Sequence, residues 1–106
     1  MEIAERRKST RFELRLPIEL VREGNAGVSR TGETRNVSTS GVLFTSQSEL
    51  PIGQPIEYAI TLPTGKADGV TVRLHCMGKV VRTELIENGI PARVAATLDR
   101  YEFVRR

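Results

Sequence analysis

A cluster of basic side chains near the start of the chain has the chemistry to bind an anion. The stretch ERRKSTRF contains Arg6, Arg7, Lys8 and Arg11, and Arg7 and Arg11 form the pattern R-x-x-x-R. Arginine offers a planar fork of N–H donors that matches a phosphate group or the edge of a guanine. Because the chain contains thirteen arginines, about one or two such pairs are expected by chance, so the pattern needs support from elsewhere.

A second motif, Asn36-Val-Ser-Thr-Ser-Gly41, has the pattern [D/N]-x-S-x-x-G. The amide of Asn36 and the hydroxyl of Ser38 can donate and accept hydrogen bonds from fixed places, and Gly41 permits a positive φ and the close approach of a ligand. Asparagine, serine and glycine are also standard turn residues, so on its own the motif is better explained by an ordinary turn.

Alternating apolar residues predict the strands that would position both motifs. Phe12, Leu14, Leu16, Ile18 and Leu20 recur every second position, so we expect a strand directly after the basic cluster, with Phe12 on its core face. The second motif separates a weaker predicted strand over 29–37 from a short apolar strand over 42–45. The remaining strands are expected over 56–62, 70–86 and 90–98.

About six strands joined by Gly/Pro turns predict an antiparallel all-β domain, and a twisted sheet of this size can close into a small barrel. Gly78 falls inside the longest strand and indicates a bulge or a close backbone approach. Asp99 is expected to cap a short C-terminal helical turn that runs through Arg106. We expect residues 1–106 to form a single domain, of which residues 1–11 are a flexible basic arm.

The composition is that of an ordinary soluble domain, with 39% hydrophobic residues, 27% charged residues and a net charge of +3. The chain has no Trp, so the core should be mainly aliphatic. No apolar run approaches the roughly eighteen residues that span a bilayer, and the N-terminus has no apolar signal region. We therefore expect a cytoplasmic protein without membrane insertion.

Enzymatic and metal chemistry are poorly supported. His75 and Cys76 are the only histidine and cysteine; as neighbours in a predicted strand they should point to opposite faces, whereas a zinc site needs about four converging ligands. No nucleophile–base arrangement and no glycine-rich phosphate loop is present. We therefore expect no enzyme, no catalytic residue, no metal and no cofactor.

The two motifs in this order, followed by an all-β remainder, resemble the PilZ domain family over nearly the whole chain. "RFELRLPIEL" resembles the first strand of the family, "NVSTSGVLF" its second motif running into a strand, and "MGKVVR" its long central strand. The resemblance implies a six-stranded β-barrel, usually followed by a helix. It also implies a bacterial second-messenger receptor for cyclic di-GMP.

The resemblance further implies roles for individual residues. Arg7 and Arg11 would hold the phosphates and the Hoogsteen edges of guanine. Asn36 and Ser38 would bind a guanine edge or the phosphate–sugar ring, and Gly41 would keep that surface open. Family members with an arginine in the position of Arg6 tend to bind two intercalated ligand molecules, so we predict two molecules of cyclic di-GMP per chain.

Binding is expected to order the basic arm and so to switch an effector protein or a fused domain. One alternative is a PilZ-like protein-interaction module that binds no nucleotide, but this chain retains every motif position. A second is a general DNA or RNA binder, which we do not expect because such proteins usually need aromatic stacking platforms and the chain has 5% aromatic residues.

Overall fold

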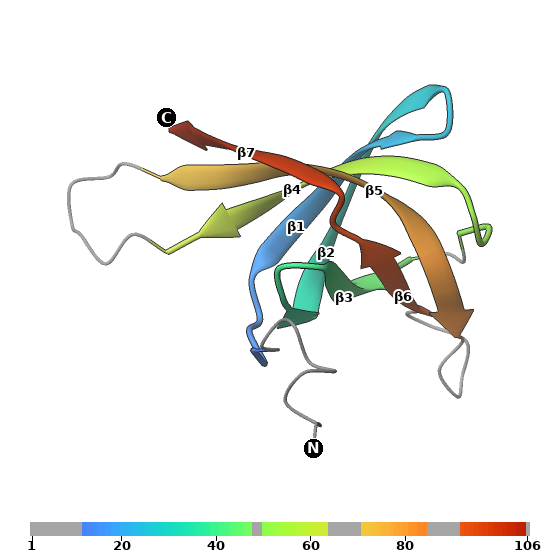
Figure 1. Ribbon diagram of the computed structural model, residues 1–106, viewed down its shortest axis with the longest axis horizontal. Coiled ribbons are helices and arrows are strands. Elements are labelled where there is room, and N and C mark those ends of the chain that lie inside the picture. The colour runs from blue at the N-terminus through green and yellow to red at the C-terminus, as the bar shows by residue number, and fades with distance from the viewer. Residues whose placement is uncertain (1–11, 48–49, 64–70, 85–91, 106) are drawn as a thin grey trace, which may run out of the picture.

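Seven antiparallel strands make up the computed structural model, which describes residues 12–47, 50–63, 71–84 and 92–105 (Figure 1). The strands are β1 (Pro17–Glu23), β2 (Ala26–Val37), β3 (Gly41–Ser46), β4 (Pro55–Leu62), β5 (Val72–Glu84), β6 (Ala92–Thr97) and β7 (Arg100–Arg105). Within these ranges the structure contains no helix, and so none that could cross a membrane.

Six of the strands close into an antiparallel barrel. Strand β1 pairs with β2 on one side and β4 on the other, β2 pairs with β3, β3 with β6, and β6 with β5. The ring closes because β5 also pairs with β4 along its first half, from Leu62↔Val72 to Pro55↔Lys79. This arrangement confirms the predicted six-stranded antiparallel barrel. Each of its six strands pairs with two neighbouring strands of the ring.

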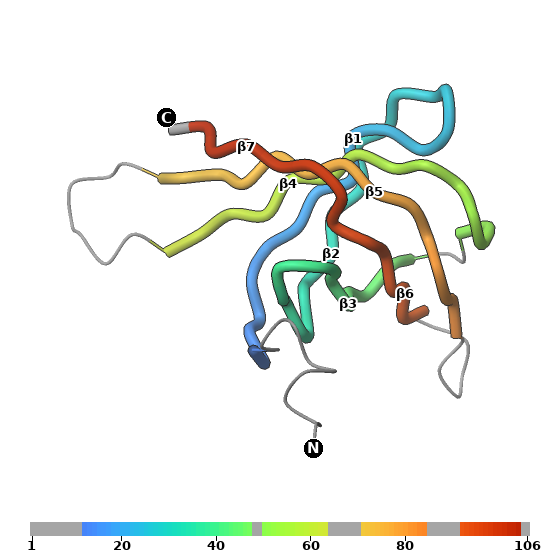
Figure 2. Tube along the Cα trace, viewed as in Figure 1, coloured from blue at the N-terminus to red at the C-terminus, as the bar shows by residue number. Residues whose placement is uncertain are grey.

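Strand β7 lies outside the ring, where a short helical turn over Asp99–Arg106 was expected. It pairs with the first half of β5, from Val72↔Arg105 to Met77↔Arg100, and Figure 2 shows the chain passing from β6 into β7 alongside β5. The expectation was wrong for 100–105 because β5 extends past β6 and offers an unpaired edge. The side chain of Asp99 accepts a hydrogen bond from Thr97 and caps no helix.

The barrel interior is filled by the inward residues of every strand of the ring. Phe44 and Tyr58 stack with ring centroids 6.3 Å apart, and aliphatic side chains surround them, as expected of a chain without Trp. Burying one such side chain contributes about 1.5–3 kcal/mol. The largest fully buried side chains are Tyr58, Phe44, Ile56, Ile60, Val80, Val94, Thr34 and Cys76.

The first strand begins later than the apolar alternation predicted. Strand β1 starts at Pro17, and Phe12 and Leu14 are 55% and 42% exposed, so Phe12 is not a core residue. Phe12 forms only an isolated bridge to β2. The apolar pattern continues through residues 12–16, but the backbone there is held to β2 partly by a side chain, as described below.

Gly78 marks the place where β5 changes partners. A Cβ at this position would collide with the carbonyl oxygen of Thr97, which confirms the predicted close backbone approach. Residues before Gly78 pair with β7, and residues from Val80 onward pair with β6. The glycine therefore allows one strand to serve two neighbours in succession.

Candidate functional site

A β-bridge between Phe12 and Val37 links the residue that follows the first motif in sequence to the middle of the second motif. The amide of Phe12 donates to the carbonyl oxygen of Val37, and the amide of Val37 donates to the carbonyl oxygen of Phe12, both at 2.9 Å. Val37 separates Asn36 from Ser38 in the second motif, and Phe12 directly follows the R-x-x-x-R motif in sequence. The arginines of the first motif, Arg6, Arg7 and Arg11, lie outside the described residues.

Thr34 fixes the segment that leads from this bridge into β1. Its fully buried side chain donates to the carbonyl oxygen of Leu14 and accepts from the amide of Leu16 at 2.9 Å, and its own amide donates to the carbonyl oxygen of Leu16. The hydroxyl thus takes the place of a regular strand ladder. This explains why residues 13–16 follow β2 without forming a strand.

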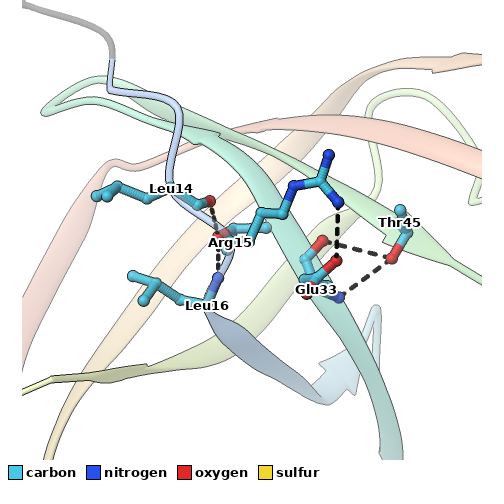
Figure 3. A network of polar contacts seen from close by, with 6 residues as sticks. Leu14, Arg15, Leu16, Glu33 and Thr45 are labelled. Carbon is cyan, nitrogen blue, oxygen red and sulfur yellow. Dashed lines mark hydrogen bonds and ion pairs between the residues drawn. The ribbon is translucent and has the colours of Figure 1, made fainter.

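A second threonine, Thr45, forms hydrogen bonds with the backbone of β2 on the outer side of the same region. The hydroxyl of Thr45 on β3 accepts from the amide of Glu33 at 3.1 Å and donates to the carbonyl oxygen of Glu33 at 3.3 Å (Figure 3). The carboxylate of Glu33 lies 3.9 Å from the guanidinium of Arg15. Arg15 is therefore paired with a carboxylate, unlike an arginine kept free for a ligand.

Ser38 is the organising residue of the turn between β2 and β3. Its hydroxyl accepts from the amides of Ser40 and Gly41, both at 3.2 Å, and its amide donates to the carbonyl oxygen of Gly41 at 2.9 Å. A serine that satisfies the amides of its own turn holds the turn in one shape. The structure thus gives Ser38 a positioning role within the motif.

Asn36 and Gly41 lie at the two ends of the turn. Asn36 pairs with Leu43, which alternates with the buried Val42 and Phe44, so both Asn36 and Leu43 face outward. In the part of the chain that the structure describes, the side-chain amide of Asn36 has no hydrogen-bond partner. It is half-exposed and available to a ligand.

Gly41 does not use the positive φ that a glycine permits, but the structure gives it another role. The glycines with positive φ in the described segments are Gly24 and Gly53, so Gly41 does not use that freedom. A Cβ on Gly41 would lie 2.9 Å from the carbonyl oxygen of Ala96, closer than side chains tolerate. The glycine therefore lets the motif turn pack directly against β6.

The turn rests on a corner formed by Thr97 to Asp99. The amide of Leu98 donates to the carbonyl oxygen of Ser40 at 3.0 Å, and the hydroxyl of the buried Tyr58 donates to the carbonyl oxygen of Thr97 at 2.9 Å. Burial, with smaller contributions from Cys76 and Asp99, raises the pKa of Tyr58 well above its usual value. The phenol therefore stays protonated and keeps this bond.

His75 and Cys76 lie on opposite faces of β5, as the alternation predicted. Cys76 is completely buried, and burial raises the pKa of its thiol to about 12. His75 is half-buried on the outer face, with Nε2 3.8 Å from a carboxylate oxygen of Glu57. Among the residues that the structure describes, no three His, Cys, Asp or Glu side chains converge on a metal-sized site.

Three residues of this region were not identified from the sequence: Thr34, Tyr58 and Thr97. Tyr58 carried a usable signal, because a tyrosine on the inward face of a predicted strand must find a partner for its hydroxyl. Thr34 and Thr97 carried none, because Thr34 acts on the backbone amide of Leu16, 18 positions away, and Thr97 on the hydroxyl of Tyr58, 39 positions away.

Comparison with solved structures shows the same fold in the inhibitor of motility MotI/DgrA of Bacillus subtilis. The similarity covers 91% of this chain and 44% of that protein, with a TM-score of 0.71 and 13% sequence identity. The chain thus spans less than half of the length of that neighbour. No curated protein matches the sequence.

The family model of the PilZ domain matches residues 5–102. The chain, with its six-stranded barrel, therefore belongs to the PilZ domain family.

Proposed function

We propose that the chain is a receptor module for cyclic di-GMP. The observation that carries the proposal is the Phe12–Val37 bridge, which joins the residue after R-x-x-x-R to the centre of N-x-S-x-x-G. A cyclic dinucleotide carries two phosphates and two guanines, and arginine is the side chain best matched to both groups. Membership in the PilZ family supports this ligand.

The binding residues have distinct tasks in this proposal. Arg7 and Arg11 hold the phosphates and the Hoogsteen edges of guanine. Asn36 supplies a free amide on the outer face, and Ser38 acts mainly by holding the turn. Gly41 keeps the turn against β6, and Arg6 stacks on a second ligand molecule.

Signalling follows from the position of the motif arginines before the bridge. When two phosphates draw Arg7 and Arg11 toward Asn36, the segment before Phe12 is fixed on the barrel surface. Whatever adjoins or contacts that segment then changes its position or its exposed surface. The target is an effector protein or a fused domain, and neither catalysis nor a cofactor is needed.

The test is a calorimetric titration with cyclic di-GMP, beside GTP and cyclic GMP. We expect binding of the cyclic dinucleotide alone, saturating at two molecules per chain. Arg7→Ala and Arg11→Ala should each weaken binding by tens-fold or more, because truncating one partner of a desolvated charge pair typically costs about 2–5 kcal/mol. Arg22→Ala should bind as the wild type does, since Arg22 is paired with Glu57.

Either of two outcomes contradicts the proposal. If the wild type releases no heat with cyclic di-GMP at any accessible concentration, the chain is not its receptor, and a protein-interaction module becomes the better explanation. If the wild type binds but both motif variants keep its affinity, the ligand lies elsewhere. Saturation at one equivalent would refute only the role of Arg6.

A further inference from the structure

The ion pairs divide the arginines of the described segments into two groups. Four arginines have a carboxylate oxygen within 4.0 Å, and all four lie on or next to the β1–β2–β4–β5 side of the barrel. The pairs are Arg15–Glu33, Arg22–Glu57, Arg30–Glu23 and Arg73–Glu19. By contrast, the side chains of Arg35, Arg82, Arg93 and Arg100 have no hydrogen bond or ion pair within the described segments.

Three of these arginines lie on strands beside the second motif, Arg35 on β2, Arg82 on β5 and Arg93 on β6, whereas Arg100 lies on β7 outside the ring. The register joins Asn36 to Leu43, Leu43 to Ala95, and Ala95 to Arg82, so these four residues form one row across β2, β3, β6 and β5. Residues directly opposite each other point to the same side of a sheet. Because Leu43 faces outward, Arg82 does too, and it is exposed.

One register shift and a neighbouring row place the other two arginines next to this row. Arg35 is the extra residue of the register shift between Thr34 and Asn36. Arg93 pairs with Thr45, one row away from Leu43 on the same face. The Nε atoms of Arg35 and Arg93 are buried without a hydrogen-bond partner in the described segments. We call Arg35, Leu43, Arg82, Arg93 and Ala95 the arginine face.

The dimensions and chemistry of this face suit a flat, doubly charged ligand. Strands lie about 4.8 Å apart, so Asn36 and Arg82 are separated by about 14 Å across the barrel surface. Between them lie only the half-buried Leu43 and Ala95, which form a low apolar strip. Glu84, the cross-strand partner of Arg93, is not within ion-pair distance of its guanidinium.

We propose that the arginine face is the distal half of the cyclic di-GMP site. The guanines lie over Leu43 and Ala95, and Arg82 and Arg93 bind the phosphate or guanine edge farthest from Asn36. This inference rests on the proposed function, and it adds contacts from β5 and β6 that neither motif contains. Unpaired guanidinium groups around an apolar strip favour an anion with a planar, weakly polar face.

The experiment compares two double variants of equal charge. Arg82→Ala/Arg93→Ala should weaken cyclic di-GMP binding at least tenfold by calorimetry. Arg22→Ala/Arg30→Ala, which removes the same charge from the β1–β2 hairpin, should bind within twofold of the wild type. Arg82→Lys/Arg93→Lys should recover only part of the loss, because lysine keeps the charge but not the planar fork. Melting temperatures of all variants verify that each is folded.

The outcomes separate this inference from the function on which it rests. If Arg11→Ala loses binding while Arg82→Ala/Arg93→Ala loses less than tenfold, the arginine face is not part of the site and the proposed function stands. An equal loss in both double variants would show a general effect of charge and would also overturn the inference. A wild type that does not bind cyclic di-GMP would overturn both.

Discussion

At the scale of single residues, Thr34 has the largest structural role near the motifs. It is fully buried on β2, yet its hydroxyl serves two backbone groups of a segment that makes no regular strand. Thr45 makes a similar pair of bonds to the backbone of Glu33 from a more exposed position. The two threonine hydroxyls therefore make comparable hydrogen bonds to the backbone, one from a buried position and one from a more exposed position.

We predict that Thr34→Val lowers the free energy of unfolding by about 1–3 kcal/mol. Valine has nearly the same shape but leaves the carbonyl oxygen of Leu14 and the amide of Leu16 without their partner. Thr45→Val should cost less than about 1 kcal/mol, because water can replace its hydroxyl. Urea denaturation of both variants is the measurement, and equal losses would contradict the role assigned to burial.

At the scale of elements, the period-two pattern predicted most strands because it reports which face is buried. It placed Ile56 to Leu62 correctly, and the glycine in the longest strand correctly indicated a close backbone approach. It failed at Phe12 because an apolar alternation cannot show that Thr34 interrupts the ladder. It also missed β7, whose strand conformation depends on an edge of β5 that only the folded barrel provides.

The candidate site, like the fold, was predicted in part from the sequence. The motifs name Asn36, Ser38 and Gly41 as residues of one turn, and the structure confirms that turn. The sequence could not show that the hydroxyl of Ser38 accepts hydrogen bonds from the amides of its own turn. Nor could it show which arginines lack a carboxylate partner, because that depends on the register between strands distant in sequence.

We predict that Gly78→Ala destabilises the fold by more than about 3 kcal/mol. The added Cβ would collide with the carbonyl oxygen of Thr97, a backbone atom that cannot move without opening the β5–β6 corner. Gly27→Ala is the control, since nothing lies within 4 Å of its Cβ position; we expect a change within about 0.5 kcal/mol. Thermal unfolding measures both, and a Gly78→Ala melting temperature equal to that of Gly27→Ala would refute the argument.

At the scale of the whole molecule, the closed ring isolates the ionisable groups of its core from water. Cys76 is completely buried and its pKa rises from 9.0 to about 12, because burial disfavours the thiolate. Between these two values the folded thiol holds a proton that the unfolded thiol has released. The resulting stabilisation is complete below about pH 9 and is lost as the pH rises toward 12.

Wild-type stability should therefore fall above about pH 9 more steeply than that of Cys76→Ala. Burial of Tyr58 acts in the same direction in both proteins, so the difference between the two curves reports the thiol together with its smaller effect on the pKa of Tyr58. Urea midpoints at pH 7, 8.5, 10 and 11 provide the measurement. Curves that fall in parallel would contradict the assigned pKa. The native protein should also resist thiol reagents at neutral pH until it unfolds.

The last prediction concerns how the barrel would transmit a ligand signal to the segment before Phe12. In the proposed receptor, cyclic di-GMP contacts Arg7 and Arg11 on one side of the Phe12–Val37 bridge and Asn36 on the other. Amide hydrogen exchange over residues 5–12 should therefore slow markedly with ligand, whereas exchange in the β1–β2 hairpin around Gly24 should not change. Arg11→Ala should abolish the slowing at a ligand concentration that saturates the wild type. Equal exchange over residues 5–12 with and without bound ligand would show that the signal leaves the barrel by another route.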